Sequence, residues 1–229
     1  QSDLISEFGH ELRTPLASLS TATYLLLRPE ISQEQREQII FNIHNETLRL
    51  NTLASSFLDL ARLESGRVQF RKTRFSVGDL IYECKDVMQG KADENRIKLR
   101  VESVEHLPLL EADRDKIKQV ILNLLSNAIK YNRPSGSVII SADSTEVEIA
   151  ITVQDTGMGI PDDALPHLFE KFYRVREHEN KAGGTGLGLS ISKQIMQGHN
   201  GALEVKSKIG VGTAFTMRLP RNSKTMPRK

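Results

Sequence analysis

Residues 7–16 read EFGHELRTPL, and this stretch sets one histidine between two residues that weaken helices. Gly9 directly precedes His10 and lowers helix stability by roughly 1 kcal/mol, while it leaves the imidazole without a bulky neighbour on that side. Pro15 has no N–H to give to the carbonyl of Glu11, so a helix through this stretch should bend beside His10. The pattern predicts a helix that gives up local stability to keep His10 approachable.

The residues around this stretch predict two helices joined by a short loop. Apolar residues recur at steps of three and four from Leu4 to Leu27, and a similar pattern runs from Gln33 to Glu64, as in amphipathic helices. Gly66 is expected to close the second helix, and such a pair forms an antiparallel hairpin. The expected apolar stripes are Leu4, Phe8, Leu12, Leu16, Leu19, Thr23 and Leu26 on the first helix, and Ile39, Ile43, Leu50, Leu53, Phe57 and Leu60 on the second.

One partner helix covers only half of each stripe. We therefore expect two hairpins to dimerise into a four-helix bundle, and the alternative is that the stripes pack against the rest of the same chain. His10 lies about 200° around the first helix from Phe8, at about 100° per residue, and is expected to face solvent. Thr14, four residues on, shares that face. Taken alone, His10 could also be an ordinary surface histidine.

After Gly66 the apolar pattern changes to alternation, which indicates half-buried strands separated by helices. Ser76 and Asp113 are expected to cap two of these helices, and a third follows the glycines at 183–188. The expected strands cover residues 97–101, 137–142, 146–153, 202–205 and 213–219. The predicted fold class is α+β, with a helical hairpin over 1–66, an α/β sandwich with a mixed, mostly antiparallel sheet over 67–221, and a disordered tail over 222–229.

Composition narrows the function classes. The 229 residues carry 31 basic and 29 acidic side chains, and this even balance argues against nucleic-acid or anionic-membrane binding. The single cysteine, Cys84, cannot form an internal disulfide and fits a reducing compartment such as the cytoplasm. Apolar stretches are too short to span a bilayer, so membrane attachment is expected only through segments outside this chain.

Four stretches carry residues suited to a nucleotide. The helical stretch NLLSNAIKYN (123–132) places two asparagine carbonyl oxygens four residues apart, and such hard ligands suit Mg²⁺. DTGMGI (155–160) sets a carboxylate at a strand end, beside glycines that permit close backbone approach. FEKFYRV (169–175) offers two aromatic rings and Arg174, and GGTGLGLSI (183–191) leads into a helix N-terminus that favours phosphate.

Better-known nucleotide motifs do not fit this chain. No GxxxxGK[ST] occurs, which excludes a P-loop, and Leu189 interrupts the spacing that a GxGxxG dinucleotide motif needs. Neither HRD nor DFG appears, which excludes the eukaryotic-type protein kinase pattern.

Together the motifs resemble one family. HELRTPL resembles the phosphoacceptor motif of sensor histidine kinases, and the four later stretches resemble, in order, the ATP-binding domain that these kinases share with gyrase-type and Hsp90-type ATPases. The resemblance implies ATP and Mg²⁺ as cofactors, a homodimer, autophosphorylation of His10, transfer to an aspartate of a response-regulator receiver domain, and phosphatase activity toward that regulator. The departures are small: Gly9, Asn132 and the GHNG of 198–201 stand where serine, a hydroxyl residue and HGG are common.

The resemblance also implies roles for individual residues. Glu11 would hold the other imidazole N–H of His10, Thr14 would position a water for the phosphatase reaction, and Arg174 would reach the γ-phosphate. A surface ion pair and plain helix surface remain the alternatives for Glu11 and Thr14. Asn127 would bind Mg²⁺, and Asp155 would accept from the adenine amino group. The implied nucleotide-binding residues are Asn123, Asn127, Lys130, Tyr131, Asp155, Gly157, Gly159, Phe172, Gly184, Thr185, Gly186, Leu187 and Gly188, and residues 162–184, with Phe169 and Phe172 as anchors, would form a lid.

Two other functions stay open at this point. One is a scaffold that binds ATP or a partner without transferring phosphate. The other is a gyrase-like or Hsp90-like ATPase that hydrolyses ATP to drive conformational change.

Overall fold

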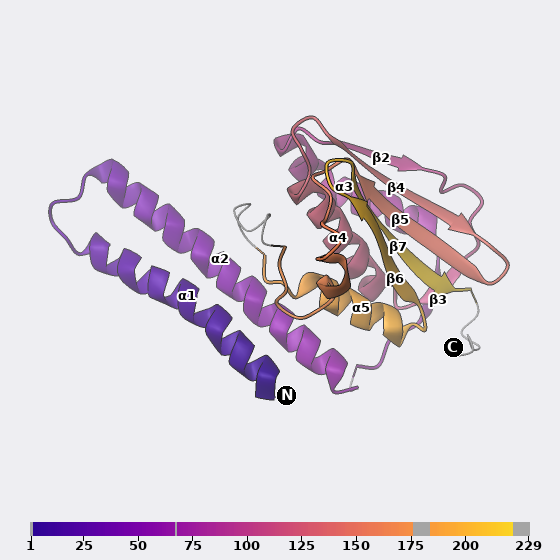
Figure 1. Ribbon diagram of the computed structural model, residues 1–229, viewed down its shortest axis with the longest axis horizontal. Helices are drawn as coiled ribbons and strands as arrows, with labels where there is room; N and C mark the ends of the chain where they lie inside the picture. The colour runs from indigo at the N-terminus through magenta and orange to yellow at the C-terminus, as the bar shows by residue number, and fades with distance from the viewer. Residues whose placement is uncertain (1, 67, 176–183, 222–229) are drawn as a thin grey trace.

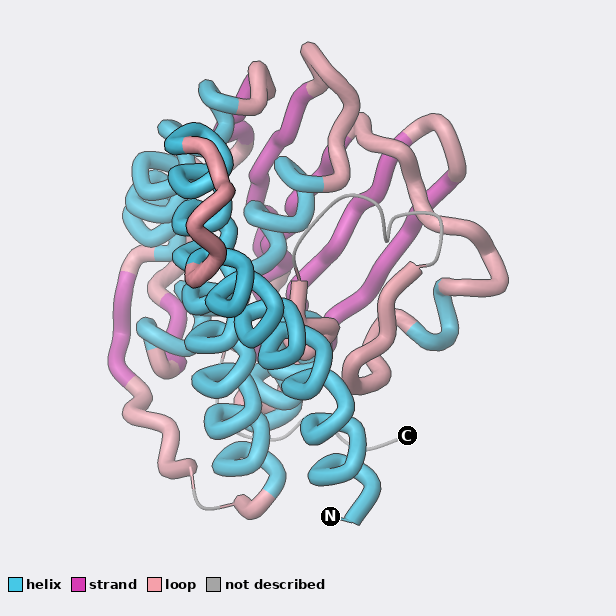
Figure 2. Tube along the Cα trace, turned by 90° about the vertical axis from the view of Figure 1, so that its left-hand side faces the viewer, coloured by secondary structure: helices cyan, strands magenta, loops and turns pink. Residues whose placement is uncertain are grey.

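The computed structural model describes residues 2–66, 68–175 and 184–221 (Figure 1). The chain opens with α1 (Ser2–Leu26) and α2 (Gln33–Glu64), which form an antiparallel hairpin (Figures 1 and 2). Near one end of the hairpin the Phe8 and Phe57 rings stack with centroids 3.9 Å apart. At the other end Arg36 Nη1 donates to the Leu26 carbonyl at 3.3 Å. The predicted helices are thus present with nearly the expected bounds.

Local signals account for where α2 begins and ends. Ser32 and Gln35 form a reciprocal capping box at its start. Ser65 is the C-cap, and Gly66 follows in the left-handed region at φ +65°, a conformation that glycine adopts without a Cβ penalty. Pro15 is buried inside α1, and the helix continues through it to Leu26. The predicted bend at this proline stays a prediction.

The apolar stripe of the hairpin divides into an inner and an outer part. Leu4, Leu53 and Leu60 are buried, whereas Leu16 and Thr23, which the pattern assigns to the first stripe, are exposed. Part of the inner face rests on the second half of the chain, because α2 packs against α5 (Gly188–Gly198). Packing within the chain therefore exists, and a set of large apolar side chains still faces outward: Ile5, Leu16, Tyr24, Ile40, Phe41, Leu48 and Leu58.

The second half of the chain is built on a five-stranded sheet. Its strands are β2 (Lys98–Glu102), β4 (Ser137–Ser144), β5 (Glu148–Asp155), β6 (Ala202–Lys208) and β7 (Gly212–Pro220). They lie in the order β2-β4-β5-β7-β6. Only the β2–β4 pair is parallel, so this sheet is mixed and mostly antiparallel, as predicted.

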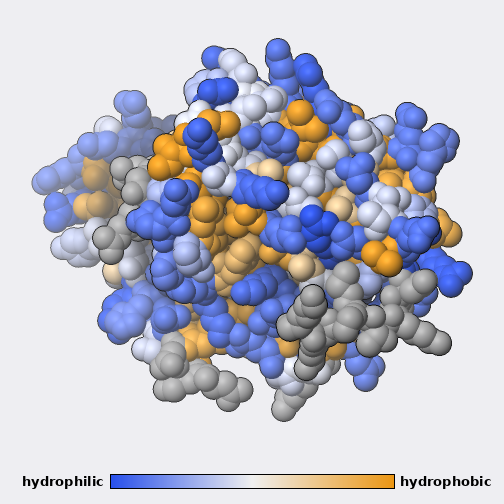
Figure 3. All heavy atoms as spheres, turned by 45° about the vertical axis from the view of Figure 1, so that its right-hand side comes forward, coloured by the Kyte–Doolittle hydropathy of each residue, from blue (hydrophilic) through white to orange (hydrophobic). Residues whose placement is uncertain are grey.

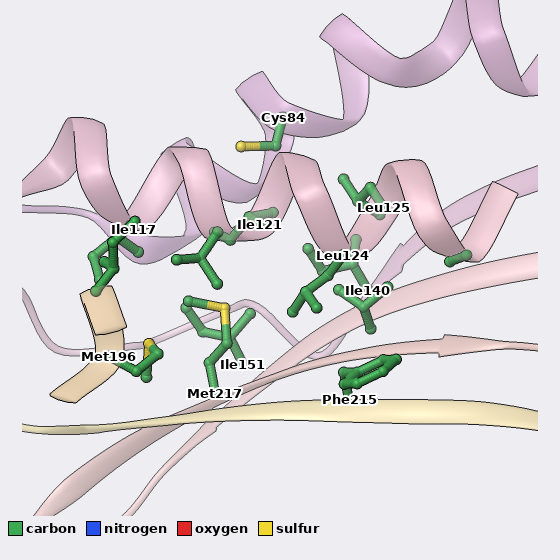
Figure 4. Packing of buried hydrophobic residues seen from close by; sticks show 14 of the residues in the cluster. Cys84, Ile117, Ile121, Leu124, Leu125, Ile140, Ile151, Met196, Phe215 and Met217 are labelled. Carbon is green, nitrogen blue, oxygen red and sulfur yellow. The ribbon is translucent and has the colours of Figure 1, made fainter. Parts of the chain in front are cut away.

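Three helices cover one face of this sheet: α3 (Val77–Glu94), α4 (Arg114–Lys130) and α5 (Figure 1). Ser76 and Asp113 cap α3 and α4 as predicted, by accepting from the backbone N–H of Asp79 and Lys116. Alternating apolar residues of β4, β5 and β7 meet the apolar face of α4, and Figure 4 shows the resulting core. Its labelled members are Cys84, Ile117, Ile121, Leu124, Leu125, Ile140, Ile151, Met196, Phe215 and Met217.

Two short strands were not expected from the sequence. β1 (Thr73–Phe75) and β3 (Leu110–Ala112) pair antiparallel in a separate two-stranded sheet. Three residues are too few to show an alternating pattern, because such a pattern needs at least about four. The fold class is otherwise confirmed: a helical hairpin followed by an α/β sandwich.

The surface is mainly hydrophilic. Figure 3 shows charged and polar side chains over most of one face, with apolar atoms gathered near its middle. Among the described residues, none of the helices combines the length and apolar character that crossing a membrane requires. The expected tail, residues 222–229, lies outside the described residues.

Candidate nucleotide and phosphoacceptor sites

A cavity of about 630 Å³ opens between α4, the end of β5, the glycine-rich loop before α5 and the side of α2. Its size lies within the usual range for ligand sites, about 300–1,000 Å³. Most of the residues that the sequence assigns to a nucleotide site line it. They are Asn123, Asn127, Lys130, Tyr131, Asp155, Gly159, Arg174, Gly184, Thr185, Gly186 and Gly188.

Asp155 lines the cavity together with the apolar residues Ile160 and Phe215, a part of the wall that we call the apolar end, and the residue is only 9% exposed. Its Oδ1 accepts from the backbone N–H of Gly157 at 2.8 Å and of Thr213 at 3.2 Å. Both hydrogen bonds that the described residues make to this carboxylate end on Oδ1, which leaves Oδ2 to meet a donor on a ligand. Burial raises the pKa of Asp155 to about 6, although the two backbone hydrogen bonds oppose that rise.

The two glycines after Asp155 act in different ways. Gly159 lines the cavity in the left-handed region at φ +72°, and a Cβ there would collide with the backbone of Lys208. Gly157 is buried and does not line the cavity. A Cβ on Gly157 would lie 2.5 Å from the Tyr131 carbonyl oxygen, so this glycine lets the Asp155 turn pack against the end of α4.

The last two turns of α4 supply the polar wall. Asn123 and Asn127 are one helical turn apart, and Asn123 Nδ2 donates to Ser192 Oγ of α5 at 3.0 Å. Lys130 and Tyr131 follow, with the lysine Nζ 4.7 Å from the centroid of the tyrosine ring. The spacing predicted from NLLSNAIKYN thus gathers two amides and one ammonium group at one side of the cavity.

The glycine-rich loop lies close against this wall. A Cβ on Gly184 would lie 3.0 Å from Lys130 Nζ, and one on Gly188 would collide with Asn123 Oδ1. Gly186 is left-handed at φ +68°, and its Cβ would lie 2.5 Å from the backbone carbonyl carbon of Phe172. Glycine at these positions therefore lets the loop pack closely against α4 and against the Phe172 backbone beside the cavity.

Two residues assigned to nucleotide binding lie behind the site instead. Leu187 is fully buried and belongs to the hydrophobic core. Phe172 packs against that core with a left-handed backbone at φ +59°. Neither lines the cavity. Both support the loop that does, and the lid-anchoring role expected of Phe172 stays a prediction. Residues 176–183, within the expected lid, lie outside the described residues.

Other lining residues were missed at the sequence level. Lys91 of α3 lines the cavity, and its Nζ donates to Ser126 Oγ at 2.8 Å. Burial, and then the charge of Lys130, lower the pKa of Lys91. Thr213 lines the apolar end as well, and five residues of α2 line the side that faces the hairpin. No short motif marks these positions, because they join the site through tertiary packing.

His10 lies on α1 outside this cavity. His10 and Thr14 are both exposed, as the helix geometry predicted, and Glu11 is half-buried. The described residues show no hydrogen bond between His10 and Glu11. This agrees with the divergence of about 100° between neighbouring side chains on a helix. The role expected of Glu11 therefore stays a prediction.

The cavity suits a metal ion that arrives with phosphate. The described residues contain no cluster of three or more histidine, cysteine, aspartate or glutamate side chains that could hold a metal by themselves. Asn127 offers an amide oxygen in a cavity that Lys130 and Arg174 also line. Mg²⁺ commonly takes one or two protein oxygens and completes its shell with phosphate oxygens and water, so this donor set fits it.

Comparison with known proteins identifies both halves of the chain. Residues 1–66 match the family described as "His Kinase A (phospho-acceptor) domain". Residues 112–223 match the family described as "Histidine kinase-, DNA gyrase B-, and HSP90-like ATPase". The sensor histidine kinase YkoH of Bacillus subtilis (strain 168) is 38% identical over 224 residues, which cover 95% of this chain and 47% of YkoH. The chain thus spans less than half the length of this relative.

Two solved structures share the fold. ShkA, solved full-length in complex with AMPPNP, superposes with a TM-score of 0.72 at 28% identity over 96% of this chain and 45% of its own. The histidine kinase ThkA, solved with the response regulator protein TrrA, superposes with a TM-score of 0.81 over 98% of this chain and 63% of its own. At 23% sequence identity, this likeness shows a shared fold alone. With the phospho-acceptor and ATPase domains in this order, the chain belongs to the sensor histidine kinases and comprises their catalytic core.

Proposed function

We propose that this chain binds ATP with Mg²⁺ in the cavity beside α4 and transfers the γ-phosphoryl group to His10. Residues 1–66 would serve as the dimerisation and phosphotransfer hairpin, and residues 67–221 as the ATP-binding domain. The observation that carries the proposal is the pairing of an exposed histidine on α1 with a cavity that combines a buried carboxylate, two amides and a glycine loop.

Adenine specificity follows from Asp155. The carboxylate lies at the apolar end of the cavity and can accept from the amino group of adenine through Oδ2. Guanine presents a carbonyl at the equivalent position, and two acceptors facing each other would leave the buried carboxylate unpaired. With a pKa of about 6, Asp155 is mostly ionised at neutral pH and can act as this acceptor.

The transfer step depends on position and charge more than on a strong base. A ring nitrogen of His10 forms a bond to the γ-phosphorus of ATP as the bond from that phosphorus to the leaving oxygen of ADP breaks. Lys130 and Arg174 line the cavity where they can hold phosphate oxygens. Mg²⁺, when bound by Asn127 with Asn123 in support, would neutralise charge on the phosphates.

Transfer also requires the two halves of the chain to move. His10 does not line the cavity, and α2 packs against α5 and makes two polar contacts with the described part of the ATP-binding half. Glu64 forms an ion pair with Lys171 at 2.6 Å, and Gln119 donates to Asp59 at 3.1 Å. The ion pair is partly solvent-exposed, and such pairs contribute little stability, so the packing of α2 against α5 is the main contact that this motion must break. We propose that the segment between Gly66 and β1 is the hinge of this motion.

The outward apolar residues of the hairpin support dimerisation. Ile5, Leu16, Phe41, Leu48 and Leu58 are each more than half exposed, which is unusual for large apolar side chains unless a partner covers them. We propose that a second copy of the hairpin covers this surface in a four-helix bundle, the arrangement that the phospho-acceptor family implies.

The partner that receives the phosphoryl group is a response-regulator receiver domain in this proposal. ThkA was solved in complex with a response regulator, which supports the same class of partner here. Thr14, exposed on the His10 face, would position a water for dephosphorylation of that regulator. ATP and receiver domains are both cytoplasmic, so we place this core in the cytoplasm and any membrane attachment outside this chain.

Incubation with γ-labelled ATP and Mg²⁺ separates this proposal from its rivals. Kinase activity leaves label on the protein. A scaffold would bind ATP without becoming labelled, and a gyrase-like ATPase would release labelled phosphate while the protein stays unlabelled. Label that then moves to a receiver domain would complete the proposed route, whereas either rival result would reject it.

A further inference from the structure

The hairpin supplies one wall of the nucleotide cavity. Asn45, Arg49, Thr52 and Ser56 of α2 all line it. Their spacing of four, three and four residues places them on one face of the helix. Every side chain of this stripe is polar, although α2 is otherwise an amphipathic helix whose inner face carries leucines. This polar face of α2 borders the cavity that we assign to ATP.

Arg49 of α2 and Lys130 of α4 line the same cavity from two different helices. The Gln119–Asp59 hydrogen bond fixes one point of contact between α4 and α2. From there, Arg49 lies about 15 Å back along α2 and Lys130 about 17 Å forward along α4, at about 1.5 Å per residue. In the view of Figure 1 the N-terminal part of α2 and the C-terminal part of α4 run apart, and residues of both line the cavity.

The charges at the cavity wall favour a polyanion. Arg49, Lys91, Lys130 and Arg174 line it, against two carboxylates, Glu46 and Asp155. Asp155 belongs to the apolar end, where adenine would lie. Such an excess of positive charge concentrates anions in a cleft.

Glu46 holds Arg49 at this wall. The Arg49 Nη1 lies 3.2 Å from Glu46 Oε1, and the two side chains are 35% and 21% exposed. A guanidinium group has five donors, so one hydrogen bond to Glu46 leaves others that can bind phosphate oxygens. The arginine is therefore oriented toward the cavity without being saturated by its partner.

We infer that Arg49 of the hairpin binds the phosphates of ATP across the two halves of the chain. This inference rests on the proposed function, since it takes ATP as the occupant of the cavity. Nucleotide bound in this way stabilises the arrangement in which α2 lies against the ATP-binding half, and by linkage that arrangement raises the affinity for nucleotide. His10 does not line the cavity in this arrangement, so Arg49 must release the phosphates before transfer to His10 can occur.

The test compares the affinities of the 229-residue chain for AMPPNP and for adenosine, by calorimetry or by NMR titration. Arg49→Ala should weaken AMPPNP binding about five- to tenfold, less than a buried charge-assisted hydrogen bond contributes because this site is partly exposed, and should leave adenosine binding unchanged. Arg62→Ala is the matched control, because Arg62 is an exposed arginine of the same helix outside the cavity, and it should change neither.

Glu46→Gln should change the AMPPNP affinity in the direction opposite to Arg49→Ala. Removal of this carboxylate releases Arg49 and lowers the repulsion of phosphate, so AMPPNP should bind about two- to threefold more tightly. If the Glu46–Arg49 ion pair only stabilised α2, both substitutions would change the AMPPNP affinity in the same direction.

Equal affinities of Arg49→Ala and wild type for AMPPNP, or an equal loss of affinity for AMPPNP and for adenosine, would overturn the inference while ATP binding stands. Failure of the wild-type chain to bind AMPPNP at all would instead overturn the proposed function and this inference with it.

Discussion

The His199 ring accepts a hydrogen bond at its Nε2 from the backbone N–H of Asp113, 3.0 Å away and 86 residues earlier in the chain. Its Nδ1 lies 2.8 Å from the Ile195 carbonyl oxygen and must donate to it. The ring is therefore neutral and in one tautomer, and burial lowers its pKa. This contact joins the start of α4 to the end of α5, two helices whose residues line the cavity.

Replacement of His199 by leucine should destabilise the ATP-binding half by about 1–3 kcal/mol, because the buried N–H of Asp113 loses its acceptor. The pH dependence has a definite sign. Since the folded-state pKa lies below the reference value of 6.5, wild type should lose stability as the pH falls below about 6.5, and the variant should lack that contribution. Denaturant unfolding at pH 7.5 and 5.5 measures the loss of stability and its pH dependence. His44→Leu, at an exposed histidine, is the control. An equal pH slope in wild type and His199→Leu would contradict this role.

Asp155 should show opposite effects on stability and on binding. Its pKa is raised from 3.8 to about 6, so its ionisation costs folding free energy on the order of 2–3 kcal/mol above pH 6, a cost that is absent below about pH 4. Asp155→Asn should therefore raise the melting temperature of the ligand-free chain at pH 7.5. The same variant should bind AMPPNP much more weakly, because the amide cannot replace both carboxylate oxygens as acceptors. A variant that melts lower than wild type at pH 7.5 would show that the carboxylate stabilises the fold.

Gly186→Ala tests whether the glycine-rich loop before α5 needs its observed conformation to bind nucleotide. A methyl group at this left-handed position would lie 2.5 Å from the Phe172 backbone, and backbone cannot move aside cheaply. We expect at least a tenfold loss of AMPPNP affinity, with the fold retained by circular dichroism. Gly90→Ala is the control, because a Cβ at that exposed helical position meets no atom within 4 Å. Unchanged affinity in Gly186→Ala would mean that the loop does not need its observed conformation to bind nucleotide.

Gly9→Ala tests whether looseness beside His10 matters for its phosphorylation. A Cβ at residue 9 meets no atom within 4 Å, so the change should be tolerated and should raise helix stability by up to about 1 kcal/mol. If local looseness helps the imidazole to approach ATP, the initial rate of autophosphorylation should fall while AMPPNP affinity stays the same. An autophosphorylation rate equal to or above that of wild type would show that Gly9 does not assist phosphorylation of His10.

Much of the fold could be predicted because its signals are local. The bounds of α2 followed from its apolar period and from Gly66, and Ser76 and Asp113 were recognisable as caps. The stripe of α1 was assigned less well, since Leu16 and Thr23 keep the period and yet remain exposed. Periodicity identifies an apolar face, but it does not reveal which part of that face finds a partner within the chain.

Some residues of the candidate nucleotide site could likewise be identified from the sequence, and others could not. Asn123, Asn127 and Lys130 were identified because helix geometry sets them on one side, and their cavity-lining positions agree with that reasoning. Leu187 and Phe172 belong to motifs that surround the site, although their side chains support it from the core. Arg49 and Lys91 could not be found from motifs, since they reach the cavity only through the packing of α2 and α3 against α4.

The most direct test of the central claim is the position of the phosphoryl label. After incubation of the chain with γ-labelled ATP and Mg²⁺, we expect an acid-labile, base-stable label, which is the behaviour of a phosphoramidate. The label should be lost in His10→Gln and retained in His44→Gln, which alters another exposed histidine, on α2. Label that persists in His10→Gln, or a wild-type chain that binds magnesium and ATP but never becomes labelled, would contradict the assignment of His10 as the phosphoacceptor.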